Sequence, residues 1–250
     1  RELDESIKQF HGIDLGQFRA QTSASGAFKY LRTLIEEKGV YVLLAGNLGS
    51  HHSNIDAAVF RGFVLSDEVA PFIVINDQDA RSAWSFTLLH ELIHLWLGKT
   101  GLSDQTSDNQ VEQFCDAVAS QILLPQDEFD AFMPDHVDIG ELVEQISEFA
   151  NTVMLSRKLV AYRLLRRGDI TPKVYGIVTQ LFYREWRESK EAAKAKRTGA
   201  PDYYVVKKHR IGNALFDVVK RFSKSGALSS SKSGILLDVS SLNANKLLKL

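Results

Sequence analysis

The sequence is poor in cysteine: Cys115 is the only one among 250 residues. A single cysteine cannot form an internal disulfide framework, so the composition fits a reducing compartment. The chain also lacks a run of about 18 apolar residues, which a transmembrane helix would need. Its charged start at Arg1 has no signal-peptide pattern and suggests a fragment or a processed form. These absences predict a cytoplasmic protein that has no contact with a membrane.

The chain as a whole has almost no net charge, but each half has a large net charge of one sign. The net charge is −1, yet residues 1–150 carry 9 Lys and Arg against 24 Asp and Glu, whereas residues 151–250 carry 21 against 7. This split indicates an acidic part joined to a basic one. The basic half could contact nucleic acid or an acidic partner, or the two halves could attract each other.

The pattern of apolar residues predicts an α+β fold with a small, mainly antiparallel sheet. Residues 1–38 have a helical pattern, and residues 40–45, 57–65 and 71–75 are expected to form strands. A strand at residues 59–65 could lie at the edge of the sheet and bind a substrate chain by strand addition. Further helices are expected at the following ranges: 84–97, 109–124, 138–150, 156–167, 173–195, 209–223, 229–236 and 240–248.

An HExxH motif stands inside the apolar helix expected at residues 84–97. Its histidines, His90 and His94, are four residues apart, so they lie on one helical face and can bind the same divalent metal. Two core histidines that bond the backbone are the structural alternative. Because burying two polar rings without partners costs several kcal/mol, a metal ion is favoured.

A third metal ligand is available on the next expected helix. Glu112 and Asp116 are one turn apart there, so that both face the same side. Glu112 could complete a three-ligand catalytic zinc site, with one zinc ion per chain. Asp116 could accept the N–H of a ligating histidine and fix its orientation. Cys115 is interpreted as a small core residue and not as a ligand.

The glutamate inside the motif, Glu91, is placed one residue away from the ligand positions. It suits the role of general base, which would take a proton from the attacking water and pass it to the leaving amine. A further oxyanion or substrate contact could come from His51, His52 or Tyr41, chosen by residue type alone. A structural or surface role is the alternative for each of these three.

Four segments of the chain together resemble the ImmA/IrrE metallo-endopeptidases, gluzincin-like proteases of bacteria and their mobile elements. They are residues 60–65 (FRGFVL), 71–77 (PFIVIND), 86–95 (FTLLHELIHL) and 112–125 (EQFCDAVASQILLP), with weaker similarity over residues 155–164. The resemblance places the family's zinc ligands at His90, His94 and Glu112 and its catalytic glutamate at Glu91. Gln121 departs from the glutamate that the family often has at this position.

The resemblance implies regulatory proteolysis. Family members cut helix-turn-helix repressors of phage, conjugative-element or stress-response genes and so release transcription. Long members often carry an N-terminal helix-turn-helix domain, and none is visible in this sequence. The expected partner is therefore a protein substrate, a helix-turn-helix repressor.

Residues 141–165 resemble a helix-turn-helix, and a second small helix pair is expected at residues 229–236 and 240–248. Nucleic acid could be contacted by basic residues of the first pair: Arg157, Lys158, Arg163, Arg166 and Arg167. The alternative is a helical subdomain that covers the protease and binds its substrate or an activator.

We therefore predict three parts: a gluzincin-like zinc protease domain at residues 1–135, a helix-turn-helix-like segment at 136–170 and a basic helical region at 171–250. The predicted function is a zinc endopeptidase that makes a limited cut in a transcriptional regulator. The main alternative is a DNA-binding regulator whose metal site is structural or sensory. A metal-dependent toxin or antitoxin component is a weaker alternative.

Overall fold

The computed structural model of the chain has an α+β fold, as the sequence predicts, and it describes residues 2–47, 53–98, 101–102, 109–134, 138–196, 199 and 202–249. The strands are β1 (Tyr41–Leu44), β2 (Gly62–Leu65), β3 (Phe72–Ile75) and β4 (Gly101–Leu102). The helices of the first part are α1 (Glu2–His11), α2 (Leu15–Arg19), α3 (Ala24–Glu36), the 3-10 turn η1 (Arg81–Ala83), α4 (Trp84–Trp96), α5 (Asn109–Leu123) and α6 (Gln126–Asp130). Those of the second part are α7 (Ile139–Thr152), α8 (Arg157–Arg167), α9 (Pro172–Ala195), α10 (Tyr203–Ile211), α11 (Asn213–Lys224), α12 (Ser230–Leu236) and α13 (Ser241–Leu247).

The sheet has the strand order β1-β3-β2-β4, with β1 parallel to β3 and the other two pairs antiparallel. It is therefore mainly antiparallel, as predicted. The expectation of an edge strand at residues 59–65 is wrong, because β2 lies between β3 and β4 and pairs with both. This strand also begins later than expected. The carboxylate of Asp56 accepts a hydrogen bond from the Ala58 N–H at 2.9 Å, which holds the preceding residues in a turn.

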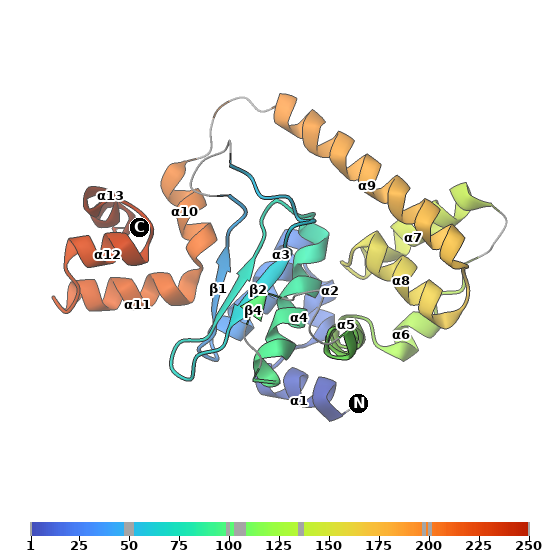
Figure 1. Ribbon diagram of the computed structural model, residues 1–250, viewed down its shortest axis with the longest axis horizontal. Coiled ribbons are helices and arrows are strands. Elements are labelled where there is room, and N and C mark those ends of the chain that lie inside the picture. Colours follow the sequence, from blue (N-terminus) through green and yellow to red (C-terminus); the bar gives the residue numbers. More distant parts are fainter. Residues whose placement is uncertain are drawn as a thin grey trace.

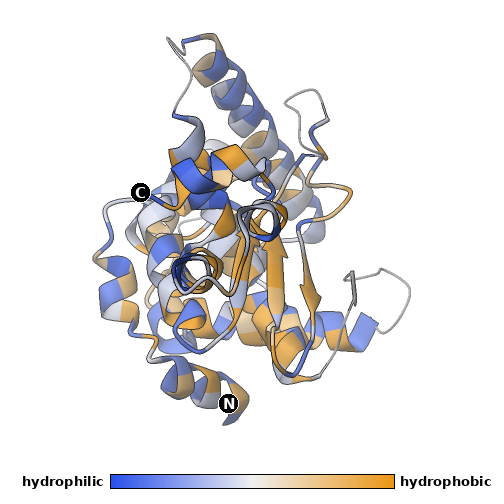
Figure 2. Ribbon diagram, turned by 90° about the vertical axis from the view of Figure 1, so that its left-hand side faces the viewer, coloured by the Kyte–Doolittle hydropathy of each residue, from blue (hydrophilic) through white to orange (hydrophobic). Residues whose placement is uncertain are grey.

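One face of the sheet packs on helices α3 and α4. The side chains on this face are apolar and buried, and they alternate with outward residues along each strand: Val42, Leu44, Val64, Ile73 and Ile75. Figure 1 shows α4 running beside the sheet, with α5 next to it. In Figure 2 the strands are almost wholly hydrophobic, whereas the helices carry hydrophilic residues as well. Helix α4 thus lies in the middle of the core.

The N-terminal 38 residues form three helices where the sequence pattern suggested a continuous helical region. Helix α1 ends before Gly12, whose φ of +69° is the left-handed conformation that glycine adopts without strain. Asp14 then caps α2 by accepting a hydrogen bond from the Gln17 N–H at 2.8 Å, and Ser23 caps α3 through the Gly26 N–H. In the same way Gly212, at φ +84°, divides the helix expected at residues 209–223 into α10 and α11.

The hydrophobic core has one large cluster and one small one. The large cluster runs from Ile7 to Phe182, and the small cluster joins α11, α12 and α13 through residues such as Phe216 and Leu247. The predicted boundaries at residues 135 and 170 stay a prediction, and the large cluster is continuous across both. In Figure 1, α7–α9 and α10–α13 lie on opposite sides of the sheet and α4.

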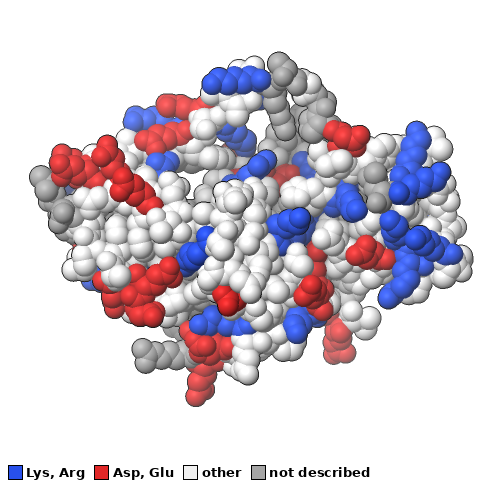
Figure 3. Space-filling model, turned by 180° about the vertical axis from the view of Figure 1, so that it is seen from behind, with Lys and Arg blue, Asp and Glu red and all other residues white. Residues whose placement is uncertain are grey.

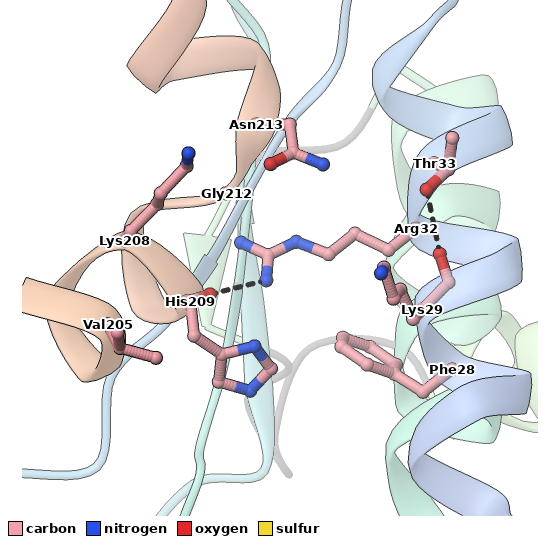
Figure 4. Close-up of a pocket in the computed structure, with 9 residues that line it drawn as sticks. All are labelled: Phe28, Lys29, Arg32, Thr33, Val205, Lys208, His209, Gly212 and Asn213. Carbon is pink, nitrogen blue, oxygen red and sulfur yellow. Dashed lines mark hydrogen bonds between the residues drawn. The ribbon is translucent and has the colours of Figure 1, made fainter. Parts of the chain in front are cut away.

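A buried arginine on α3 joins the C-terminal helices to the sheet. Arg32 donates hydrogen bonds to the carbonyl oxygens of Val42 and of His209, the latter at 2.7 Å, and it pairs with Glu36 at 3.1 Å. Glu36 in turn accepts from the Asn213 N–H at 3.1 Å. Figure 4 shows the guanidinium of Arg32 crossing from α3 to the α10–α11 turn. A polar network therefore anchors α10 and α11 beside β1.

Within the described residues, no helix combines the length and the apolar character that crossing a bilayer requires.

Candidate metal centre

Helix α4 presents two histidines to helix α5. His90 and His94 are buried, and their Nε2 atoms lie 3.1 Å apart. They face the same side because they are separated by about one turn of an α-helix. The α4 residues Leu88, Leu89 and Leu92 are buried, so the backbone that carries both rings is held in place by the packed core.

Glu112, in the first turn of α5, closes the group. Its Oε2 atom lies 3.2 Å from Nε2 of His90, and its Oε1 atom lies 3.2 Å from Nε2 of His94. Cys115 and Ala119 are fully buried on α5 and fix its position in the core. Among the residues that the structure describes, these three are the group of His, Cys, Asp or Glu that could hold a metal ion, with ligand atoms within 4.8 Å of one another.

The spacing of these atoms fits a tetrahedral metal ion. Zinc keeps nitrogen and oxygen ligands about 2.0–2.2 Å away, which places two ligands of a tetrahedron roughly 3.3 Å apart. The Nε2 atoms of the two histidines, 3.1 Å apart, match this value, and each of the two Glu112 oxygens lies 3.2 Å from one of these nitrogens. Two imidazoles and a carboxylate are also a donor set that suits a catalytic zinc ion. The residues present therefore fit the metal that the sequence predicts.

The charges around the histidines favour a cation at this place. Burial disfavours the charged form of His90, but Asp116, Glu112 and Glu91 outweigh it and raise the pKa of His90 to about 9. The pKa of His94 is lowered, by burial first and then by the positive charge of His90. The hydrogen bond from His90 lowers the pKa of Glu112. The buried, protonated ring of His90 thus lies among carboxylates, and a divalent cation could replace its proton.

Asp116 lies where the sequence predicts, behind His90. Its Oδ1 atom is 3.0 Å from the Nδ1 atom of His90, on the side of the ring away from Glu112. When the ring is neutral, as binding to a metal requires, a carboxylate in this position accepts the Nδ1–H and leaves the Nε2 lone pair for the metal ion. The two acidic residues of α5 therefore contact both nitrogens of the same ring.

Glu91 is buried, at 2 % exposure, and it lies against the start of strand β2. A Cβ atom added to Gly62 would come within 2.9 Å of both Cγ and Oε1 of Glu91, and within 2.8 Å of Thr87 Cγ2. Only a glycine leaves room for the Glu91 side chain here. The sequence analysis missed this contact, although a glycine at the start of an apolar strand signals a close approach of another group.

The other predicted contacts of the site are not part of it. Tyr41 stacks on Phe72 with ring centroids 4.9 Å apart, and both point to the face of the sheet opposite the one that packs on α4. Tyr41 as an oxyanion or substrate contact is therefore wrong, because strand alternation turns it away from His90. His51 and His52 lie outside the described residues.

The basic residues of α8 are largely used inside the molecule. Arg163 is 8 % exposed and donates to the carbonyl oxygen of Leu124 at 2.7 Å and to Ser120 Oγ at 3.1 Å. Arg163 as a nucleic-acid contact is therefore wrong, because its guanidinium faces the core. Arg167 donates to the carbonyl oxygens of Phe129 and Phe132.

Three basic residues of α8 remain accessible to different degrees. Arg157 forms an ion pair with Glu185 at 2.5 Å and lies over the ring of Phe182. Lys158 and Arg166 are exposed. Nucleic-acid contact by these residues stays a prediction.

A cavity between α3 and the C-terminal helices lies away from the metal centre. It has a volume of about 390 Å³ and lies between α3 and the α10–α11 turn, around the anchoring residue Arg32 (Figure 4). No residue of the metal centre lines it, so it belongs to the attachment of the C-terminal helices.

Comparison with known protein families gives one match. A family model described as the IrrE N-terminal-like domain, Peptidase_M78, matches residues 36–165, which is just over half of the chain. The matched range extends from the end of α3 to α8 and contains all the residues of the centre. No curated protein matches the chain.

Proposed function

Because the chain belongs to the IrrE N-terminal-like (Peptidase_M78) family of metallopeptidases, we propose that it is a zinc-dependent endopeptidase that makes a limited cut in a transcriptional regulator. The observation that carries this proposal is the group formed by His90, His94 and Glu112, whose ligand atoms all lie within 4.8 Å of one another. The buried carboxyl group of Glu91 stands next to them on the same helix.

Each residue of the centre has a distinct task in this proposal. His90, His94 and Glu112 hold one zinc ion per chain, and Asp116 orients the His90 ring. When bound, zinc supplies a Lewis acid and lowers the pKa of water in the site. Glu91 takes the proton of the attacking water and passes it to the nitrogen of the leaving amine. Gly62 gives this carboxylate the space to turn toward the substrate.

Burial strengthens the chemistry that these residues can perform. Because α4 lies inside the core, Glu91 and the two histidines act in surroundings of low polarity. Their positions are set before substrate arrives, so little reorganisation is needed during the reaction.

We propose that the substrate is a helix-turn-helix repressor and that the cut takes place in the cytoplasm. The similarity of residues 60–125 to the ImmA/IrrE metallo-endopeptidases supports this substrate class, since members of that family cut such repressors. Cleavage would release transcription of stress-response or mobile-element genes.

The test is to incubate the purified chain with zinc and the helix-turn-helix regulator encoded beside its gene, and to identify the fragments by mass spectrometry. We expect two defined fragments, none in the presence of a chelator, and recovery when zinc is added back. An intact regulator together with cleavage of another protein would reject the substrate class. A zinc-loaded chain that cuts neither the regulator nor denatured casein would favour a structural or sensory metal.

A further inference from the structure

The chain contains two helix pairs whose turns have the same conformation. The turn between α7 and α8 has Met154 at φ +55°, and the turn between α12 and α13 has Asp238 at φ +50°. In the first turn the Leu155 N–H donates to the Ala150 carbonyl at 2.9 Å, and in the second the Val239 N–H donates to the Gly234 carbonyl at 2.8 Å. This is a common way for a helix to end, and α1 and α8 end in the same way at Gly12 and Gly168. The feature that both pairs share with a helix-turn-helix is a connection of four residues between consecutive helices.

The equivalence extends to the start of the second helix in each pair. Ser156 caps α8 by accepting from the Leu159 N–H at 3.2 Å, and Ser240 caps α13 by accepting from the Asn243 N–H at 3.3 Å. Both pairs are expected from the helical patterns of the sequence, and their turns have the same backbone pattern in the structure.

The α12–α13 pair is packed as a unit. A Cβ atom at Gly234 would lie 2.7 Å from the Val239 carbonyl oxygen, so the turn folds tightly back on α12. The residues between the helices are fully buried: Ser233, Leu237, Ala244 and Leu247. Phe216 and Val219 of α11 close the same cluster. Helices α11–α13 therefore form a three-helix arrangement with its own core.

The two pairs differ in what covers their second helix. Helix α8 packs between α7 and α9, and Arg157 and Arg163 point to partners within the protein. On α13, by contrast, the outward residues are exposed in the described structure, as is Lys249 just after the helix: Ser241, Leu242, Asn245 and Lys246. The second helix of this pair is thus the one that a large ligand can reach.

The charge of this end of the molecule is strongly positive. Residues 202–249 contain nine Lys and Arg but only three Asp and Glu. Figure 3 shows Lys and Arg side chains gathered at the right-hand end, which is the α10–α13 end of Figure 1. A polyanion would therefore be attracted to the surface that carries α13.

We propose that α12–α13 is a DNA-binding helix-turn-helix and that α13 enters the major groove of duplex DNA. Asn245 and Lys246 stand on the exposed face of α13, and both are side chains that can bond base edges. The Oδ1 atom of Asn245 accepts a hydrogen bond from Ser230 Oγ at 3.0 Å, and its NH₂ group can still donate to a base. Lys249 and Lys232 flank them and can contact phosphates. Leu242, 67 % exposed, suits contact with a thymine methyl group. This binding is independent of peptide cleavage and would bring the enzyme to the genes whose regulator it cuts.

A protein partner is the competing occupant of this surface. Ile235 and Leu236 of α12 are 79 % and 47 % exposed, and such residues could form a protein interface. The positive charge favours DNA, because an apolar interface would not require it.

The test measures binding of a labelled duplex of about 30 base pairs to the full zinc-loaded chain by fluorescence anisotropy, between about 50 and 200 mM salt. The variant Lys246→Glu/Lys249→Glu is expected to bind at least about tenfold more weakly, with a salt slope reduced by about 2, because two positive charges that face the DNA are lost and reversed. The variant Arg166→Glu/Lys173→Glu makes the same charge change at exposed residues of α8 and α9 and serves as the matched control.

We expect the control variant to bind within about twofold of the unchanged chain, because it alters only the distant field of the protein. Equal losses in both variants would show that net charge, and not α13, determines binding, and would overturn the proposal. The absence of salt-dependent binding would also overturn the proposal. The same holds for a dimer whose interface covers α13 and which the variant Ile235→Ser/Leu236→Ser dissociates. Binding by Glu91→Gln, the substitution of the proposed base, should be unchanged, which keeps this test separate from that of the peptidase.

Discussion

The Nδ1 atom of His90 lies 3.0 Å from the Oδ1 atom of Asp116, while the Nε2 atom of the same ring lies 3.2 Å from Glu112. Both carboxylates come from α5 and are one helical turn apart. The ring is therefore fixed from its two ends by a single helix, and its Nε2 atom is presented to the position between His94 and Glu112.

Replacing Asp116 with Asn should weaken zinc binding by about 10- to 100-fold, because the His90 ring loses the carboxylate that fixes its tautomer. Competition with a fluorescent zinc chelator measures this change. Asp127→Asn, on the exposed side of α6, is the matched control and should leave the affinity unchanged. If the unchanged chain and the Asp116→Asn variant bound zinc with equal affinity, the proposed role of Asp116 would be contradicted.

Replacing Gly62 with Ala should lower peptidase activity at least about tenfold while zinc content stays the same. The new Cβ atom would meet Glu91 Cγ and Oε1 at 2.9 Å, so the carboxylate would have to move, and small displacements of a reacting group are costly. Gly176→Ala is the control, because its Cβ atom would meet nothing within 4 Å. The measurement is the cleavage rate of each variant at equal zinc content. An unchanged rate in Gly62→Ala would mean that catalysis tolerates a displacement of Glu91.

Replacing Arg163 with Met should lower the free energy of unfolding by about 3 kcal/mol. The carbonyl oxygen of Leu124 and the Ser120 side chain would lose a charged donor in a buried place. Arg166→Met removes an exposed arginine from the same helix and should change stability by less than about 0.5 kcal/mol. Urea unfolding measures the free energy of unfolding of both variants. If Arg163→Met were as stable as Arg166→Met, the buried hydrogen bonds of Arg163 would not stabilise the fold.

The buried ring of His11 should make stability depend on pH. Burial, with a smaller effect of Lys38, lowers the pKa of His11 to about 4 from its usual 6.5. The unfolded chain therefore takes up this proton first, and the free energy of unfolding should fall as the pH drops from about 6.5 to about 4. In His11→Phe this part of the decrease should disappear. Thermal unfolding across that range measures it, and identical slopes for the two proteins would mean that His11 does not contribute.

The metal centre could be predicted from sequence because its geometry is local to two helices. The spacing of His90 and His94, and that of Glu112 and Asp116, places each pair on one helical face whatever the rest of the fold. The centre then requires only that α4 and α5 pack against each other, and their apolar faces place both helices in the core. The fold class followed from the same periodicity.

What the sequence could not supply depends on contacts between distant segments. The direction of Tyr41 follows from the register of β1 with β3, and the position of β2 inside the sheet follows from its pairing with β4. Arg163 has the appearance of a surface residue in the sequence, but it reaches the end of α5, 39 positions earlier in the chain, at Leu124. The space at Gly62 has meaning only once Glu91 is beside it.

The most direct test of the zinc endopeptidase is to measure metal content and peptide cleavage on the same preparations of the unchanged chain and of Glu91→Gln. The substitution leaves His90, His94 and Glu112 in place and removes only the carboxylate that accepts the proton. We predict one zinc ion per chain in both proteins, cleavage by the unchanged chain, and a loss of at least about 100-fold in the variant. Cleavage by Glu91→Gln at the unchanged rate, with its zinc still bound, would contradict the proposed catalytic centre.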